Sequence, residues 1–117
     1  MSNEISAGVS IGVSLGADSV SGSASFRANA QTNGFSENEQ LIETTATLLD
    51  FEDQTTPQLL FIKNLDANNY VQIDANNSFN GFPQKLLPGQ GILLTPQTGT
   101  IYAKANVAAV LLAVVVC

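Results

Sequence analysis

The chain has 117 residues, of which ten are acidic and four are basic, and a formal net charge of −6. Four scattered cations argue against a nucleic-acid partner, which requires a basic face to neutralise phosphates. Only 12% of the residues are charged, about half the share usual in a soluble domain. Because charged residues are depleted at the centres of interfaces, this composition favours a protein that buries its surface against other subunits. A neutral, polar secreted domain is the alternative.

The chain contains no histidine and a single cysteine, Cys117. It therefore lacks the commonest general base and metal ligand, and a lone thiol forms no internal disulfide. The remaining catalytic option is a carboxylate pair, Asp66 and Asp74, which flank a predicted strand; we interpret both as turn residues. We expect no catalytic residue, no metal and no cofactor, and so no enzyme.

The two ends of the chain predict neither secretion nor membrane insertion. Residues 1–4 lack the basic region of a signal peptide. The apolar run 107–116 is shorter than the roughly 20 residues that a membrane-spanning helix needs, and its valines favour a strand. We expect a protein made in the cytoplasm that has no membrane partner.

Residues 4–31 alternate strictly between apolar and small polar side chains. The apolar positions are the odd ones from 5 to 15 and the even ones from 20 to 30, with Ser or Gly between most of them. This period of two, with a turn at residues 16–19, predicts a long antiparallel hairpin. Exposed strand edges are normally protected from pairing by lysine, proline or charge, and here Arg27 is nearly the only such residue. The hairpin therefore either pairs with another chain or is covered within its own sandwich. The predicted inter-subunit contact residues are Ile5, Val9, Ile11, Val13, Leu15, Val20, Phe26 and Arg27.

Short β-forming runs separated by Asn, Asp, Gly and Pro fill the rest of the chain. After a loop at 32–38 we expect one strand within 39–51. A loop with Asp50, Glu52 and Asp53 follows, whose oxygens either bind a hard cation or are simply solvated. The further strands are predicted at 59–65, 70–73, 86–87, 91–94, 100–105 and 107–116, with turns at 66–69, 88–89 and 97–99.

The strand at 60–65 and the run at 107–116 carry apolar residues on both faces. We expect the first to be central and the second to lie in the middle of a sandwich or at a subunit contact. Phe79 and Phe82, in the loop at 74–84, are expected to cap the core, with a ligand-binding tip as the alternative. The fold class is therefore all-β, an antiparallel β-sandwich or jelly-roll-like domain of about eight strands. Residues 1–36 form an N-terminal hairpin or arm and residues 37–117 the body.

Four segments carry a family resemblance: FIKNLD at 61–66, NYVQI at 69–73, KLLPG at 85–89 and TIYAKA at 100–105. They resemble a family of small structural proteins of tailed bacteriophage virions, in which a Ser-rich alternating segment often precedes them. The resemblance covers about half of the chain well and its N-terminal part loosely. It implies a virion component without catalytic residues, most simply a capsid decoration (cement) protein that binds between major capsid protein subunits. A small tail or head–tail connector protein is the alternative.

Such a protein would be a homo-oligomer, a dimer or trimer, on the exterior of the capsid, with the major capsid protein or other virion subunits as partners. A different class is a receptor- or carbohydrate-binding β-sandwich module, whose sites usually present exposed aromatic side chains. The candidate aromatics for that class are Tyr70, Phe79, Phe82 and Tyr102, and the chain has no tryptophan.

Overall fold

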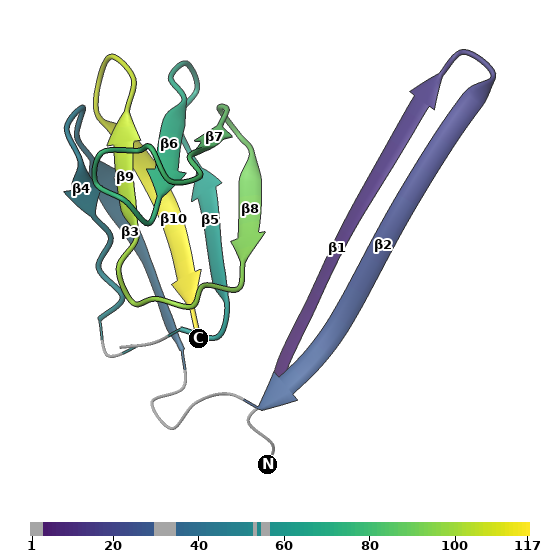
Figure 1. The fold of residues 1–117 in the computed structure, drawn as a ribbon, viewed down its shortest axis with the longest axis horizontal. Coiled ribbons are helices and arrows are strands. Elements are labelled where there is room, and N and C mark those ends of the chain that lie inside the picture. The colour runs from purple at the N-terminus through teal and green to yellow at the C-terminus, as the bar shows by residue number, and fades with distance from the viewer. Residues whose placement is uncertain (1–3, 30–34, 53, 55–56) are drawn as a thin grey trace. The chain divides into compact units, whose positions relative to one another are not determined.

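The computed structural model describes residues 4–29, 35–52, 54 and 57–117, without the side chains of Phe26, Ala28 and Asn29. The described residues contain ten β-strands, all paired antiparallel, and no helix, which confirms the all-β prediction (Figure 1). None of them therefore forms a helix with the length and apolar character needed to cross a bilayer. The chain divides into two compact units, Met1–Gly34 and Phe35–Cys117, which we call the hairpin and the body.

The hairpin consists of β1 (Glu4–Leu15) and β2 (Asp18–Asn29), in register from the pair Leu15–Asp18 to the pair Glu4–Asn29. Its turn has two residues, Gly16 and Ala17, and only Gly16 has a positive φ, of 65°. Glycine at the first position of such a turn is typical of type II′, whose twist matches that of the flanking strands. The alternating pattern and this turn together give an uninterrupted register over the full length of both strands.

The eight strands of the body are β3 (Ser36–Ile42), β4 (Thr47–Leu48), β5 (Leu60–Asn64), β6 (Val71–Asp74), β7 (Gln84–Leu86), β8 (Gly91–Leu94), β9 (Tyr102–Ala105) and β10 (Val110–Val116). They form two four-stranded sheets, ordered β3-β10-β5-β8 and β4-β9-β6-β7 (Figure 1). Strand β3 pairs with β10, β4 with β9, β5 with β8 and β6 with β7, so that the pairs are nested within one another. This nested pairing is the jelly roll, in effect one long hairpin folded over into two layers.

The core lies between the two sheets and is built from alternate residues of each strand. In β10 the side chains of Val110, Leu112, Val114 and Val116 are fully buried, whereas Leu111 is exposed on the opposite face. Both β10 and β5 have a partner on each side, so the prediction that these two apolar strands are central is confirmed. The remaining core residues are Ile42, Leu49, Phe51, Leu60, Ile62, Val71, Ile73, Leu86, Ile101, Ala103 and Ala105.

The single strand predicted within 39–51 is wrong, because this segment forms β3 and β4, which belong to different sheets. Between them the Thr47 hydroxyl donates to the Thr45 carbonyl (3.0 Å) and accepts from the Glu43 N–H (3.3 Å). Threonine favours strands but also makes such local bonds to the backbone, and here those bonds turn the chain. The strand also begins at Ser36, inside the loop predicted at 32–38.

One fully buried polar side chain, Asn64 at the end of β5, ties the two sheets together. Its amide donates to the carbonyls of Leu86 (3.0 Å, in β7) and Asn69 (2.9 Å), and its carbonyl oxygen accepts from the Asp66 N–H (2.8 Å). Its backbone also bonds to both Gly89 and Gln90 of the Pro-Gly turn. Every hydrogen-bonding edge of this buried residue is thus used to hold neighbouring turns in place.

We expect Asn64→Ala to lower the free energy of unfolding of the body by about 3 kcal/mol, because it leaves two carbonyls and one N–H without their partner. Urea unfolding followed by tyrosine fluorescence measures this change selectively, since the two tyrosines of the chain, Tyr70 and Tyr102, both lie in the body. Asn68→Ala, at an exposed position of the next turn, is the matched control and should change stability by less than about 0.5 kcal/mol. Equal effects of the two substitutions would refute a special role for Asn64.

Candidate interaction surfaces and the loop pocket

The hairpin presents an exposed apolar face. The register places the odd-numbered residues of β1 beside the even-numbered residues of β2, so the alternation predicted from the sequence produces one continuous face. We call it the apolar face of the hairpin. Its exposed fractions are 52% for Val9, 65% for Ile11, 48% for Val13, 79% for Leu15 and 67% for Val20. Five of the eight residues predicted to contact another subunit therefore lie together and uncovered among the described residues.

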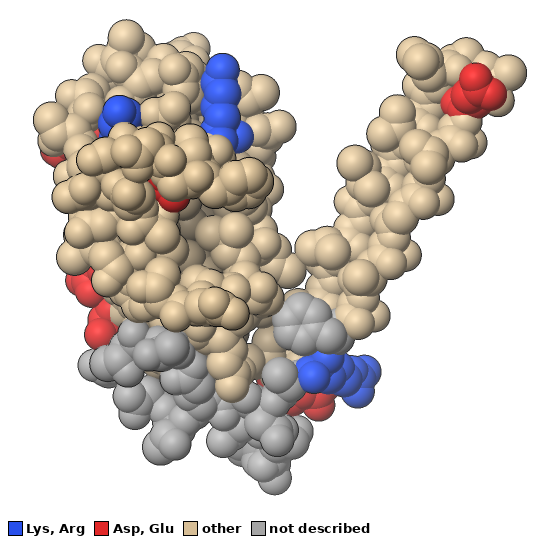
Figure 2. All heavy atoms as spheres, viewed as in Figure 1, with Lys and Arg blue, Asp and Glu red and all other residues tan. Residues whose placement is uncertain are grey.

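The other three predicted contact residues are not part of this exposed set. Ile5 shares the apolar face by its register but is buried, with an exposed fraction of 8%. Arg27 lies on the opposite face of the ribbon, where its guanidinium is 3.3 Å from the Glu4 carboxylate, and both side chains are accessible. The side chain of Phe26 is outside the described residues. The surface between the two ends of the ribbon carries no charged residue, as the uniform tan colour in Figure 2 shows.

The opposite face of the hairpin is small and polar, with seven serines, Gly8 and Gly12 between its ends. Each strand has its partner on one side only, so among the described residues both outer edges of the ribbon keep unpaired backbone N–H and C=O groups. Neither lysine nor proline protects these edges. Such an edge accepts an added strand from another chain, which would satisfy its backbone groups.

The outer side of the sheet β3-β10-β5-β8 carries a second set of exposed apolar residues, alongside the charged Glu37, Glu39 and Lys63. Leu41, Phe61 and Leu111 are exposed there, next to the half-buried Leu93 and Val115. The Phe61 ring lies over Gly91, so closely that a Cβ on Gly91 would stand 3.1 Å from ring carbons. An outer sheet face is normally polar in an antiparallel sandwich, so this surface is also suited to contact a partner.

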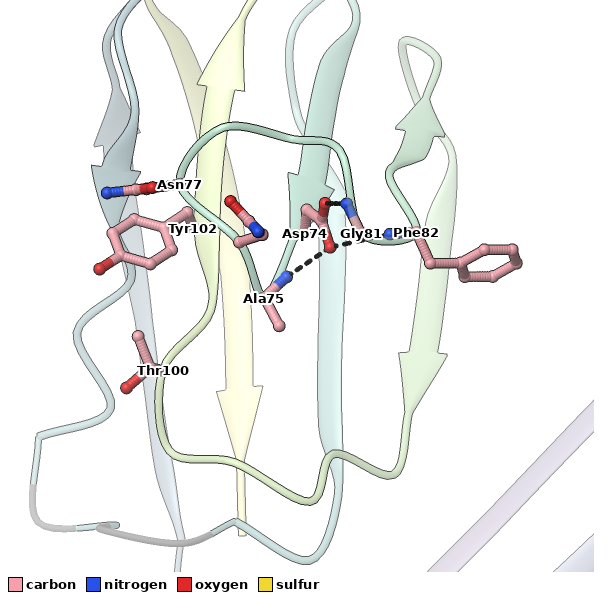
Figure 3. Close-up of a pocket in the computed structure, with 8 residues that line it drawn as sticks. Asp74, Ala75, Asn77, Gly81, Phe82, Thr100 and Tyr102 are labelled. Atoms are coloured by element: carbon pink, nitrogen blue, oxygen red, sulfur yellow. Dashed lines mark hydrogen bonds between the residues drawn. The ribbon is translucent and has the colours of Figure 1, made fainter.

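A loop of residues 75–83 is organised by the carboxylate of Asp74, the last residue of β6 (Figure 3). Asp74 is buried, and its oxygens accept from the N–H groups of Ala75 (2.8 Å), Gly81 (3.0 Å) and Phe82 (3.3 Å). A Cβ on Gly81 would come within 3.3 Å of this carboxylate, so only glycine permits the approach without a shift. The loop borders an open hollow of about 620 Å³, also lined by Asn76, Asn77, Thr100 and Tyr102.

The pKa of Asp74 reflects two opposing effects. Burial disfavours the charged form and raises the pKa, but the N–H groups of Phe82, Gly81 and Ala75 stabilise the carboxylate and bring the net pKa below its ordinary value. Asp66 also has a lowered pKa, because the N–H groups of Asn68 and Asn69 donate to its carboxylate. Both aspartates thus stay ionised at neutral pH, and each carboxylate stabilises the backbone of its own turn.

Asp66 precedes β6 and Asp74 is its last residue, so the two lie toward opposite ends of that strand, and each carboxylate is held by backbone N–H groups of its own loop. They do not form the carboxylate pair that acid–base catalysis requires. Of the acidic loop, Asp50 accepts from the Glu52 N–H (2.8 Å), and Asp53 lies outside the described residues. No group of three potential metal ligands occurs in the part of the chain that is described. Burial raises the pKa of Cys117, which keeps its thiol protonated at neutral pH.

Phe82 does not cap the core, contrary to the prediction, because its side chain is 81% exposed. In Figure 3 its ring points away from Tyr102, which lies on the other side of Asp74. The backbone bond from Phe82 to Asp74 fixes the residue in this outward position. Phe79 is half-buried instead, in a left-handed conformation with φ 54°, and the ammonium of Lys104 lies 4.8 Å from its ring centre. The spacing of the two aromatics in a loop gave no means of telling these positions apart.

No protein-family model, curated protein or solved structure matches this chain. The residues that carry the bacteriophage resemblance can therefore be judged by their structural positions alone. Asn64 and Asp66 organise the turn between β5 and β6, and Pro88-Gly89 forms a type II turn in which Gly89 has a φ of 81°. These residues build the fold rather than a chemical site.

We expect Asp74→Asn to lower the free energy of unfolding of the body by about 1–3 kcal/mol at pH 7, because a neutral amide replaces a carboxylate that accepts three N–H bonds. The folded-state pKa is below the ordinary value of 3.8, so the wild-type advantage is complete above pH 3.8 and is lost as the pH falls through the folded-state pKa. Urea unfolding at pH 7 and at about pH 2.5, which is below the ordinary pKa, measures this loss.

Asp18→Asn, which alters a carboxylate of the hairpin, serves as the control and should leave the unfolding of the body unchanged at both pH values. An Asp74→Asn deficit of the same size at both pH values would show that the ionised carboxylate does not hold the loop.

Proposed function

We propose that this protein is a non-enzymatic structural component of a bacteriophage particle, a decoration (cement) protein that binds between major capsid protein subunits. The observation that carries the proposal is the hairpin, a ribbon with two strands of 12 residues each whose apolar face is uncovered. A two-stranded ribbon in water is at best marginally stable, so a long one with an exposed apolar face is suited to being held by a partner.

Two further features support an assembly role. The outer face of the sheet β3-β10-β5-β8 is apolar around Phe61, which gives the body its own contact surface. The resemblance of residues 61–66 to phage structural proteins points to a virion as the assembly. The jelly roll is also used by viral capsid proteins, although it serves lectins and other proteins too, so fold analogy adds only background. Many weak, repeated contacts across a symmetric shell would sum to strong reinforcement.

The proposal predicts that the full-length protein co-sediments with shells assembled from the major capsid protein of the same particle. Removal of residues 1–31 should weaken this binding by at least about tenfold, because the deletion removes the exposed ribbon and its apolar area. Phe82→Ser, a change of an exposed side chain of the body, should leave it unchanged.

A density map of the decorated shell would locate the copies. Copies on the outer surface between capsid subunits support the decoration role, and copies at the tail or the head–tail junction favour the connector alternative. Absence of binding by the full-length protein to any of these parts would refute the proposal.

A carbohydrate- or receptor-binding module is the second candidate, and the exposed Phe82 beside the Asp74 hollow favours it. For this function we expect binding on a glycan array that Phe82→Ala abolishes. Phe35→Ala removes another exposed phenylalanine, far from the hollow in sequence, and should preserve the binding. An array on which the wild-type protein binds nothing would count against this candidate and leave the structural role in place.

A further inference from the structure

Near the middle of the hairpin, the apolar face has a ridge on β1 and a hollow on β2. The register places Ile11 opposite Gly22 and Val9 opposite Ala24, so large residues of β1 stand beside small residues of β2. Val9, Ile11, Gly22 and Ala24 line a shallow hollow of about 330 Å³ together with the Ser10–Ser23 pair between them. The face therefore has larger side chains on β1 and smaller ones on β2 at these two register pairs.

We propose that this face is a homotypic interface, which packs on the same face of a second copy of the chain with the two ribbons parallel and their turns at the same end. A two-fold axis that runs along the ribbon places β1 of each copy over β2 of the other at the same height. Ile11 of each copy then lies over Gly22 of the other. Each ridge fills the opposing hollow.

The other two-fold arrangement fits poorly. An axis that lies in the interface but crosses the strands places β1 over β1, so the ridges around Val9 and Ile11 collide and both hollows stay empty. Empty apolar hollows lose the contacts that make close packing favourable. Shape thus selects the parallel arrangement, in which the two hairpin turns lie at the same end.

The area of the face is consistent with a modest, concentration-dependent dimer. Strands of 12 residues extend about 40 Å, and a two-stranded face with its side chains is roughly 12 Å wide. Each copy would thus bury on the order of 500 Å², or about 1,000 Å² for the pair, close to the lower bound for a specific interface. The interface needs no shell protein, so it stands or falls independently of the proposed function.

The test measures the dissociation of the dimer by sedimentation velocity over a dilution series of the purified full-length protein. The wild type is compared with two glycine substitutions. Gly22→Val fills the hollow, although a Cβ there meets only Ile11 Cγ2, at an ordinary 3.6 Å, so the hairpin itself tolerates it. Gly12→Val is the matched control, because it makes the same exchange on the serine face, where a Cβ meets nothing within 4 Å. Valine is the better strand former in both positions, so effects on the hairpin alone should be equal.

We expect the wild-type protein to form a dimer that dissociates on dilution, Gly22→Val to weaken it by roughly ten- to a hundredfold, and Gly12→Val to change it by less than about twofold. A spin label at Ala17→Cys, in a Cys117→Ala background, reports the arrangement. Parallel ribbons bring the two turns within about 20 Å of each other, whereas crossed-axis ribbons separate them by about 40 Å.

Several results would overturn the homotypic interface: a monomer at all concentrations, equal weakening by both glycine substitutions, or a label distance near 40 Å. If the wild-type protein and Gly22→Val form dimers of equal affinity, the homotypic interface is also wrong, because the hollow would then lie outside the contact. In that case an apolar surface of another protein, or the Phe61 surface of a neighbouring body, would be the occupant of the face.

Discussion

A two-stranded ribbon cannot bury either of its own faces, and this constraint governs the whole molecule. The body solves the burial problem internally, because its two sheets cover each other with the side chains of strands such as β5 and β10. The hairpin has a single layer, so Ile11, Leu15 and Val20 stay exposed among the described residues. Burial of these side chains would require a surface outside the hairpin, and apolar burial is the dominant favourable term in such contacts. The low charge of the chain is consistent with the interfaces proposed above.

The body is specified by its polar residues as much as by its core. Valine and leucine fill both faces of β10 and therefore say little about which face is inward. The choice is fixed by where the neighbouring turns must meet, and the β5–β6 and β7–β8 turns meet at Asn64. Its amide reaches from β5 to the backbone of Leu86 in the other sheet. Buried polar groups that are fully bonded in one arrangement only are well suited to select that arrangement.

Prediction of the structure from the sequence was most accurate where apolar and polar residues alternate strictly. The alternation in 4–29 gave both strands, their turn and the composition of each face, and the apolar strands of the C-terminal half were recognised as central. It failed where short-range bonds competed with strand propensity, as at Thr47, and where a loop side chain had two possible orientations, as at Phe82. The role of Asp74 depends on N–H groups seven and eight residues away, which no local pattern expresses. The eight-strand topology needed long-range pairing that spacing alone does not provide.

The composition of the hairpin itself argues that its order is coupled to assembly. Gly8, Gly12 and Gly22 occur within its strands, where glycine weakens a strand through backbone entropy and packs no side chain. Serine occupies most other polar positions, although β-branched residues would stabilise an isolated ribbon better. A ribbon selected only to be stable by itself would replace these residues. Gly22, the one of these glycines on the apolar face, would admit the side chains of a partner. Under the proposed homotypic interface, the weakness of the free hairpin and the shape of this face would have one physical explanation, namely that folding of the ribbon is completed by contact.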